Sequence, residues 1–190
     1  MQRRWLRTTM VLLAAALLPT AAAAQTEMTA EGHGMLLYTH ALTLEYDGNS
    51  QTGGAFSVAG DIALRGRFVG RAQLDILNPG SLSGDNAENV QSGLAFVGSL
   101  GYRWQPAGPS RYSVDILGHA GYSQVTYATT GTTEFTDASP QFGFGVAPHV
   151  NFTDRLAVSF QFRFLRGADV GEGTAINRTD IGFGGRLTLF

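Results

Sequence analysis

The sequence predicts an all-β protein: an eight-stranded antiparallel up-and-down transmembrane β-barrel, preceded by a cleaved signal peptide. Three observations predict this class. The chain starts with arginines and a short apolar run. Apolar and polar residues then alternate with a period of two. The connections between the alternating stretches are long and short in turn, as expected for a barrel threaded from one side of a membrane.

The start of the chain has the three parts of a secretory signal. Arg3, Arg4 and Arg7 precede the apolar run 10–18, and small residues follow up to Gln25. That run is about half the ~20 residues that a spanning helix needs, so it does not predict a membrane anchor. We expect residues 1–24 to be removed and residues 25–190 to form the barrel domain.

The charge and cysteine content exclude several function classes. The chain has no cysteine, so it carries no disulfide framework and no thiol chemistry. All 13 basic residues are arginine; without the three in the signal, 10 arginines face 15 acidic residues, a net charge of 10 - 15 = -5. An acidic balance argues against a nucleic-acid partner.

Two segments show the strand pattern most clearly. In 93–104 one face holds Leu94, Phe96, Leu100, Tyr102 and Trp104, and the other holds Ala95, Ser99, Gly101 and Arg103. In 155–166 one face holds Leu156, Val158, Phe160, Phe162 and Phe164, and the other holds Ala157, Ser159, Gln161 and Arg163. Faces this apolar predict contact with lipid.

The same pattern predicts eight strands, at 34–46, 54–65, 67–77, 93–104, 111–125, 140–151, 155–166 and 179–189. The longer connections are 47–53, 78–92, 126–139 and 167–178, and the shorter ones are 65–67, 105–110 and 151–154. In outer-membrane barrels the short turns are periplasmic and the long loops are outside.

The polar face of these strands predicts a charged lumen. We assign to it Asp61, Arg71, Asp75, Arg103, Asp115, His119 and Arg163, with Arg65, Gln73, His149 and Gln161 beside them. Eight strands leave an interior that side chains just fill, and charges enclosed there must pair. We therefore expect a closed barrel and not a general porin.

Aromatic residues on the opposite face predict interfacial girdles. They are Tyr38, Tyr46, Tyr102, Trp104, Tyr112 and Tyr122. Two residues fit this register poorly. It places His40 on the lipid face, and it puts Pro148 inside the sixth strand, where proline cannot donate to the ladder and predicts a bulge or an interface position.

By signal, strand count, loop order and terminal Phe190, residues 25–190 resemble the small outer-membrane β-barrels of the OmpA/OmpX type. The resemblance implies that the barrel-assembly machinery recognises the last strand by its final aromatic residue. Here the apolar set 181, 183, 187 and 189 is one residue out of phase with Phe190. Either a bulge near Gly184 and Gly185 restores the phase, or Leu189 takes the outward place.

The predicted outer loops are acidic, and the short turns are basic. The loop candidates are Asp85, Glu88, Asp137, Asp169 and Glu172, with Asp180 as a neighbour, against only Arg166 and Arg178. The turns hold Arg65, Arg67, Arg111 and Arg155. Exposed loops can simply be polar. The sharper hypothesis is that they bind divalent cations shared with anionic lipopolysaccharide.

Catalytic and cofactor signals are weak, so we predict no catalytic residue, no metal ligand set and no cofactor. Asp115, His119 and Ser123 share a face, but neighbours four residues apart lie ~13 Å apart on a strand, too far for a triad. The glycine-rich stretches 143–145 and 182–185 precede no helix, so they are not phosphate loops. They predict either space for bulky lumen neighbours or curvature of the strands.

The predicted function is a structural or surface-interaction role in the outer membrane. The alternatives are a small-solute channel or binding barrel and, third, an enzyme acting on outer-membrane lipid. The sequence leaves the oligomeric state open.

Overall fold

The computed structural model describes residues 32–46, 49–64, 67–79, 89–107, 111–128, 134–168 and 175–189. The predicted signal peptide and Phe190 lie outside these ranges. The strands are β1 (Gly32–Tyr46), β2 (Asn49–Leu64), β3 (Phe68–Pro79), β4 (Asn89–Trp104), β5 (Tyr112–Ala128), β6 (Glu134–Asn151), β7 (Leu156–Gly167) and β8 (Ile176–Thr188).

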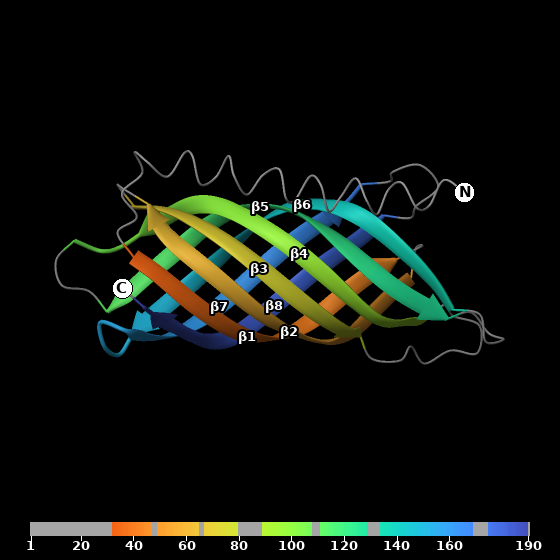
Figure 1. The fold of residues 1–190 in the computed structure, drawn as a ribbon, viewed down its shortest axis with the longest axis horizontal. Helices are drawn as coiled ribbons and strands as arrows, with labels where there is room; N and C mark the ends of the chain where they lie inside the picture. The colour runs from red at the N-terminus through yellow and green to blue at the C-terminus, as the bar shows by residue number, and fades with distance from the viewer. Residues whose placement is uncertain are drawn as a thin grey trace.

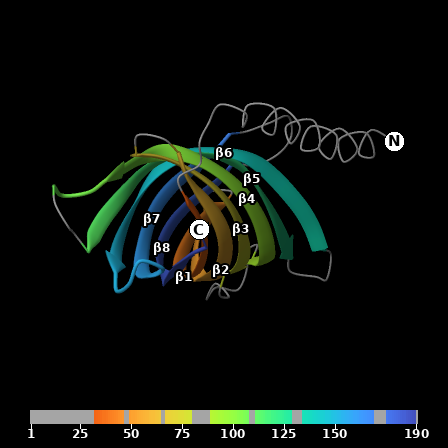
Figure 2. The same ribbon diagram turned by 60° about the vertical axis from the view of Figure 1, so that its left-hand side comes forward.

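Each strand pairs antiparallel with its neighbour in the chain, and β1 closes the barrel by pairing with β8. The strands are tilted against the barrel axis (Figure 1), and β1 and β8 lie side by side when the barrel is turned (Figure 2). A closed barrel gives every strand two partners, which removes the open edges that lipid does not tolerate. The predicted fold class is confirmed.

No helix in the described ranges is long and apolar enough to cross a membrane.

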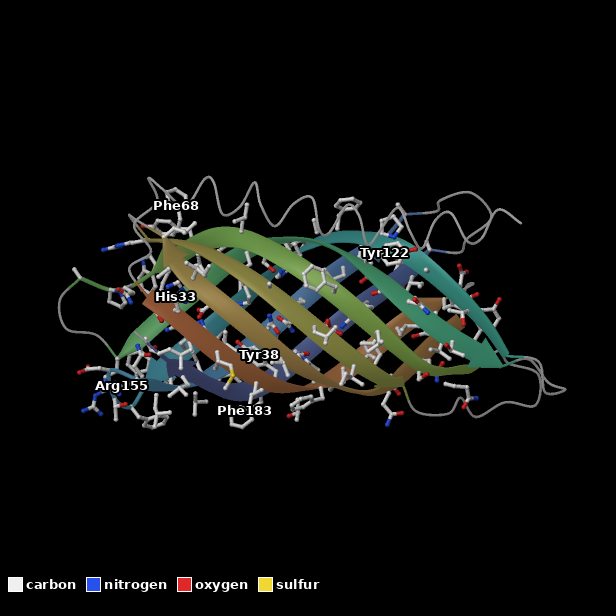
Figure 3. All side chains as sticks on the ribbon, in the orientation of Figure 1. His33, Tyr38, Phe68, Tyr122, Arg155 and Phe183 are labelled. Carbon is white, nitrogen blue, oxygen red and sulfur yellow. The ribbon has the colours of Figure 1, made fainter. Side chains whose placement is uncertain are left out.

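Large apolar side chains cover the outside of the barrel. Leu100, on β4, is 70% exposed, and Phe68 and Phe183 point away from the barrel wall (Figure 3). The outward apolar run extends from Leu94 to Trp104 on β4 and from Tyr112 to Tyr122 on β5. Such runs match the ~9–11 residues that a tilted strand needs to cross the hydrocarbon core. We call this outer surface the apolar belt.

The two faces of β4 and β7 are as predicted, but those of β1 are reversed. Tyr38, His40 and Tyr46 were expected on the lipid face, yet they are 1%, 5% and 5% exposed and point into the lumen. The reason is that the inward face of β1 also carries Leu36, Leu42 and Leu44. With apolar residues on both faces, alternation alone does not tell lipid from lumen.

Pro148 lies on the outward face of β6 without a bulge. It pairs with Val114 on β5, while the ladder to β7 is interrupted between the pairs Val146–Phe162 and His149–Ser159. The register is the same on both sides of the gap. Proline lacks an N–H to donate, so the sheet here loses pairing without shifting.

In β8 the register continues through Gly184 and Gly185 on both sides, so there is no bulge at these glycines. Leu189 takes the outward place, the second of the two alternatives. The irregularity occurs instead in β4, between Val90 and Ser92. The Gln51 amide reaches from β2 to that point, donating to the Val90 carbonyl at 2.9 Å and accepting from its N–H at 3.1 Å.

The strands are longer than predicted at the end away from the short turns. β6 starts at Glu134 and β8 at Ile176, in segments that were expected to be loops. These segments are rich in polar residues and so resemble loops in sequence. They continue the barrel wall beyond the apolar belt.

Candidate functional site

The lumen holds buried charges of both signs. Among the described residues five arginines and four aspartates are buried: Arg71, Arg103, Arg163, Arg178, Arg186, Asp61, Asp75, Asp115 and Asp180. Every one of them takes part in an ion pair. They form two groups at different heights.

The turn-end cluster lies towards the short connections and consists of Asp61, Arg71, Arg103, Asp115, His149 and Arg186. Asp115 is its hub: Arg103 Nε lies 2.7 Å from Oδ1, and Arg71 Nη2 and His149 Nε2 lie 2.7 and 2.9 Å from Oδ2. Asp61 Oδ2 accepts from Arg103 Nη2 and from Arg186 Nε, both at 3.1 Å. Side chains from six strands thus meet in one network.

The central cluster consists of Asp75, Arg163, Arg178 and Asp180. Each guanidinium lies within ion-pair distance of both carboxylates, at 3.0 and 2.7 Å for Arg163 and at 3.0 and 2.8 Å for Arg178. Ser57 Oγ and Gln73 Nε2 also donate to Asp75 Oδ1, at 2.6 and 2.8 Å. Two positive charges and two negative charges balance within the cluster.

The central cluster joins opposite walls of the barrel. Asp75 is on β3 and Arg163 is on β7, four strands away in a barrel of eight. The amides of Gln73 and Gln161 meet across the same diameter, at 3.2–3.3 Å. Because opposite strands touch through these side chains, the lumen is crossed here by bonded polar groups.

An apolar layer fills the lumen beyond the central cluster. It consists of Leu42, Leu44, Tyr46, Ala55, Leu77, Val90, Val125 and Ile176. Gln141 Nε2 donates to the Ile176 carbonyl at 2.6 Å, which ties β6 to β8 over β7. Because of this apolar layer, the alternation of β1 predicts its inward face as the lipid face.

All seven residues predicted to line the lumen are buried inside it. Six belong to the two clusters, and the seventh, His119, meets Ser99 Oγ through Nδ1 at 2.7 Å. The prediction that Arg178 belongs to an outer loop is wrong, since it lies in β8 and is buried in the lumen. Asp180, predicted in strand eight but counted with the neighbouring loop charges, also points into the lumen, and Arg186 was not predicted. The signal was available: 178, 180, 182, 184 and 186 continue one period-two face of β8.

The acidic loop prediction is only partly within the described ranges. Asp85, Glu88, Asp169 and Glu172 lie outside them. Asp137 does not belong to a loop: it is in β6, and its carboxylate accepts a hydrogen bond from Tyr46 Oη at 3.3 Å. In the part of the chain that the structure describes, no group of three or more His, Asp or Glu residues is placed to hold a metal ion.

Asp115, His119 and Ser123 do not assemble into a catalytic triad. His119 bonds to Ser99 on β4, and Ser123 Oγ donates to Gln141 Oε1 at 2.5 Å. Asp115 is engaged in the turn-end cluster. Each of the three therefore has a different structural partner.

Glycines of β6 and β8 make room for two of the lumen histidines, His119 and His40. A Cβ at Gly145 would lie 2.6 Å from His119 Nε2, and one at Gly182 would overlap the His40 ring. These contacts agree with the role of packing space that the glycine-rich stretches predict.

Gly182→Ala is expected to lower the free energy of unfolding by about 1–3 kcal/mol, because the added methyl overpacks against His40. The measurement is equilibrium unfolding in detergent. Gly60→Ala is the matched control, since a Cβ there meets nothing within 4 Å. His40→Ala should reduce the cost of Gly182→Ala; an unchanged cost in that background would contradict the steric explanation.

No protein-family model and no curated protein sequence matches the chain. Solved structures do. Neisserial surface protein A superposes with a TM-score of 0.71 at 9% identity, over 85% of this chain and 99% of that one. Ail, the attachment invasion locus protein of Yersinia pestis, gives 0.54 at 11%, over 83% and 99%. The outer membrane protease OmpT of Escherichia coli gives 0.52 at 7%, over 86% and 98%.

At such low identities the likeness concerns the fold alone. The chain's own structure agrees with this likeness: it is a closed antiparallel barrel in chain order, with an apolar belt outside and a charged lumen inside. This chain has the fold of the small outer-membrane β-barrels.

Proposed function

We propose that the chain is an integral outer-membrane protein with a structural and surface-interaction role, and that its lumen is closed. The observation that carries the proposal is the crossing of the lumen by two ion-pair clusters and an apolar layer. The apolar belt supports membrane insertion, because a soluble monomer rarely exposes such a continuous apolar surface.

A hydrated ion has no open route through the central cluster. Passage would require Asp75 and Arg163 to separate, which leaves two buried charges without partners. The apolar layer adds a second barrier, because its aliphatic side chains cannot replace an ion's hydration shell. A structural barrel accounts for both layers, whereas a general porin needs neither.

The folded protein in planar lipid bilayers is therefore expected to show no steady single-channel current. A general porin in the same bilayers provides the positive control. Folding of the sample is verified first by its heat-dependent migration in gels. Large, steady currents from a verified monomer would overturn the closed lumen and favour the alternative of a small-solute channel.

The support for a surface role is the extension of the wall beyond the belt. β5 and β6 remain paired from Tyr122–Pro140 to Ala128–Glu134, where the outward side chains are polar, such as Gln124 and Thr136. This part of the sheet would stand outside the hydrocarbon and be open to partners. Hydrogen exchange of intact cells should show protection of this hairpin when a surface partner binds.

The third candidate, a lipid-modifying enzyme, has less support. His119 is buried in the lumen and bonded to Ser99, away from any lipid. Lipid analysis of cells that express the protein, with His119→Ala as the control, tests it. A lipid change that depends on His119 would favour the enzyme.

A further inference from the structure

Arginine recurs in one position at the turn end of the barrel. The residue immediately before β3, β5 and β7 is an arginine, and the first residue of each of these strands is large, apolar or aromatic and exposed. The three pairs are Arg67–Phe68, Arg111–Tyr112 and Arg155–Leu156. The recurrence places a guanidinium at the edge of the apolar belt in each of the three short connections.

These arginines differ from those in the lumen. All three are exposed, and within the described ranges none of their side chains takes part in an ion pair. The backbone is held at two of them, since the Arg111 carbonyl accepts from Asn151 N and the Arg155 carbonyl from Thr188 N, both at 2.7 Å. At Arg111 and Arg155 a hydrogen-bonded backbone thus presents a cationic side chain without an ion-pair partner.

The backbone does not explain why an arginine occupies position 67. Its φ is 82°, in the left-handed region, and no other described non-glycine residue has a positive φ. Glycine adopts this conformation readily, whereas arginine is strained in it. A role of the side chain accounts for the residue better than a role in the turn.

We propose that Arg67, Arg111 and Arg155 form an arginine collar that binds the phosphate groups of anionic glycerophospholipids. The planar guanidinium matches phosphate geometry and can bond it in a bidentate manner. Each collar arginine directly precedes a belt residue, so its alkyl stem lies at the depth where head groups begin. The proposal rests on the proposed function, since it requires the belt to lie in a membrane.

The opposite rim offers a contrast that serves as a control. Arg166 on β7 is also exposed, but Glu45 Oε2 lies 3.5 Å from its Nη1. A paired guanidinium presents less net charge to a phosphate. Arg166→Gln therefore removes one arginine from the barrel without touching the collar.

Trp104 provides a local reporter. The chain has two tryptophans, and Trp5 lies in the segment expected to be removed as the signal peptide, so Trp104 is the one tryptophan of the predicted barrel domain. Trp104 is 49% exposed, and its strand β4 lies between two strands that follow collar arginines. On one side is β3, which follows Arg67 and pairs Phe68 with Tyr102. On the other side is β5, which follows Arg111 and pairs Val114 with Trp104. Lipids bound beside β4 therefore contact this ring.

The experiment compares quenching of Trp104 by brominated phosphatidylglycerol and by brominated phosphatidylcholine in mixed vesicles. The unmodified collar should prefer phosphatidylglycerol by about fivefold per flanking guanidinium, a preference that falls as salt is raised. Arg67→Gly with Arg111→Gln should bring the preference close to one, while Arg166→Gln leaves it unchanged. Arg67→Gly alone should lower the preference without lowering the unfolding midpoint.

A Phe152→Trp reporter in a Trp104→Phe chain tests Arg155→Gln in the same way.

No preference in the starting chain, no loss in the double variant, or an equal loss in Arg166→Gln would overturn the collar. No loss on Arg155→Gln, read at position 152, would remove Arg155 from it. These results are distinct from failure of the proposed function. A barrel that does not insert, or that conducts steadily, contradicts the proposed function, whereas an inserted, closed barrel without lipid preference contradicts only the collar.

Discussion

Asp75→Asn is expected to lower the free energy of unfolding by about 3–5 kcal/mol, because it leaves buried arginine charge without its counter-ion. Asp75 pairs with Arg163 and Arg178 at 3.0 Å each and accepts hydrogen bonds from Ser57 and Gln73. With only Asp180 left, two guanidinium groups would share one carboxylate. Asparagine has nearly the same shape, so the loss reports charge more than packing.

The measurement is reversible denaturant unfolding of the folded barrel, followed by tryptophan fluorescence. Asp154→Asn is the matched control: it makes the same chemical change at an exposed turn residue and should alter stability by no more than about 0.5 kcal/mol. Arg163→Gln added to Asp75→Asn should cost less than the sum of the single changes, since it restores the charge balance. A similar small effect for Asp75→Asn and Asp154→Asn would show that the central cluster does not hold the walls together.

Phe144→Arg is expected to destabilise the barrel in lipid by about 2–4 kcal/mol, the cost of a cation on the lipid face near mid-membrane. Phe144 is 64% exposed on β6, and its ring stacks on Phe164 with centroids 5.4 Å apart. Its exposure in the isolated chain therefore corresponds to contact with hydrocarbon and not with water.

The control for this variant is Gln124→Arg, on the outward face of β5 just above the apolar run. Cost falls to about 0–1 kcal/mol near an interface. Folding of both variants into lipid vesicles is compared by denaturant titration. Equal costs at the two positions would contradict the placement of the apolar belt in the membrane.

The strand count and the two faces of β4 and β7 follow from the sequence because lipid and lumen impose opposite chemistry. On β7 the outward row includes three phenylalanines, and the inward row includes Ser159, Gln161 and Arg163. Where the contrast is that sharp, a period of two assigns each side chain to its side.

The contrast fails where the lumen is itself apolar. The inward Leu42 and Leu44 look like lipid-facing residues, whereas the outward Thr39 and Thr43 look like lumen-facing residues. The pattern of β1 alone thus predicts the wrong face as the lipid-facing one. Only the partners of Tyr38 and His40, which are Ser159 on β7 and Ser57 on β2, show which face of β1 points into the lumen.

The missed part of the site has a different cause. Arg178 lies where the wall extends beyond the apolar belt, so the outward residues beside it are polar and only the inward period-two row marks a strand there. Its role depends on Asp75, which is 103 residues away in the chain. Closure of the barrel brings two residues this far apart in the chain together. Neither the local sequence pattern nor the number of charges predicts which residues will pair.

Thiol accessibility inside the lumen tests the closed barrel most directly. The chain has no native cysteine, so an introduced cysteine is the one thiol that can react. Ser159→Cys places a thiol at a fully buried lumen position, and Ser92→Cys places one at an exposed position on β4. With a membrane-impermeant methanethiosulfonate reagent, the closed lumen predicts that Cys at 159 reacts orders of magnitude more slowly than Cys at 92 in folded protein, and equally fast after unfolding. Comparable rates in the folded barrel would show a lumen open to water and contradict the account.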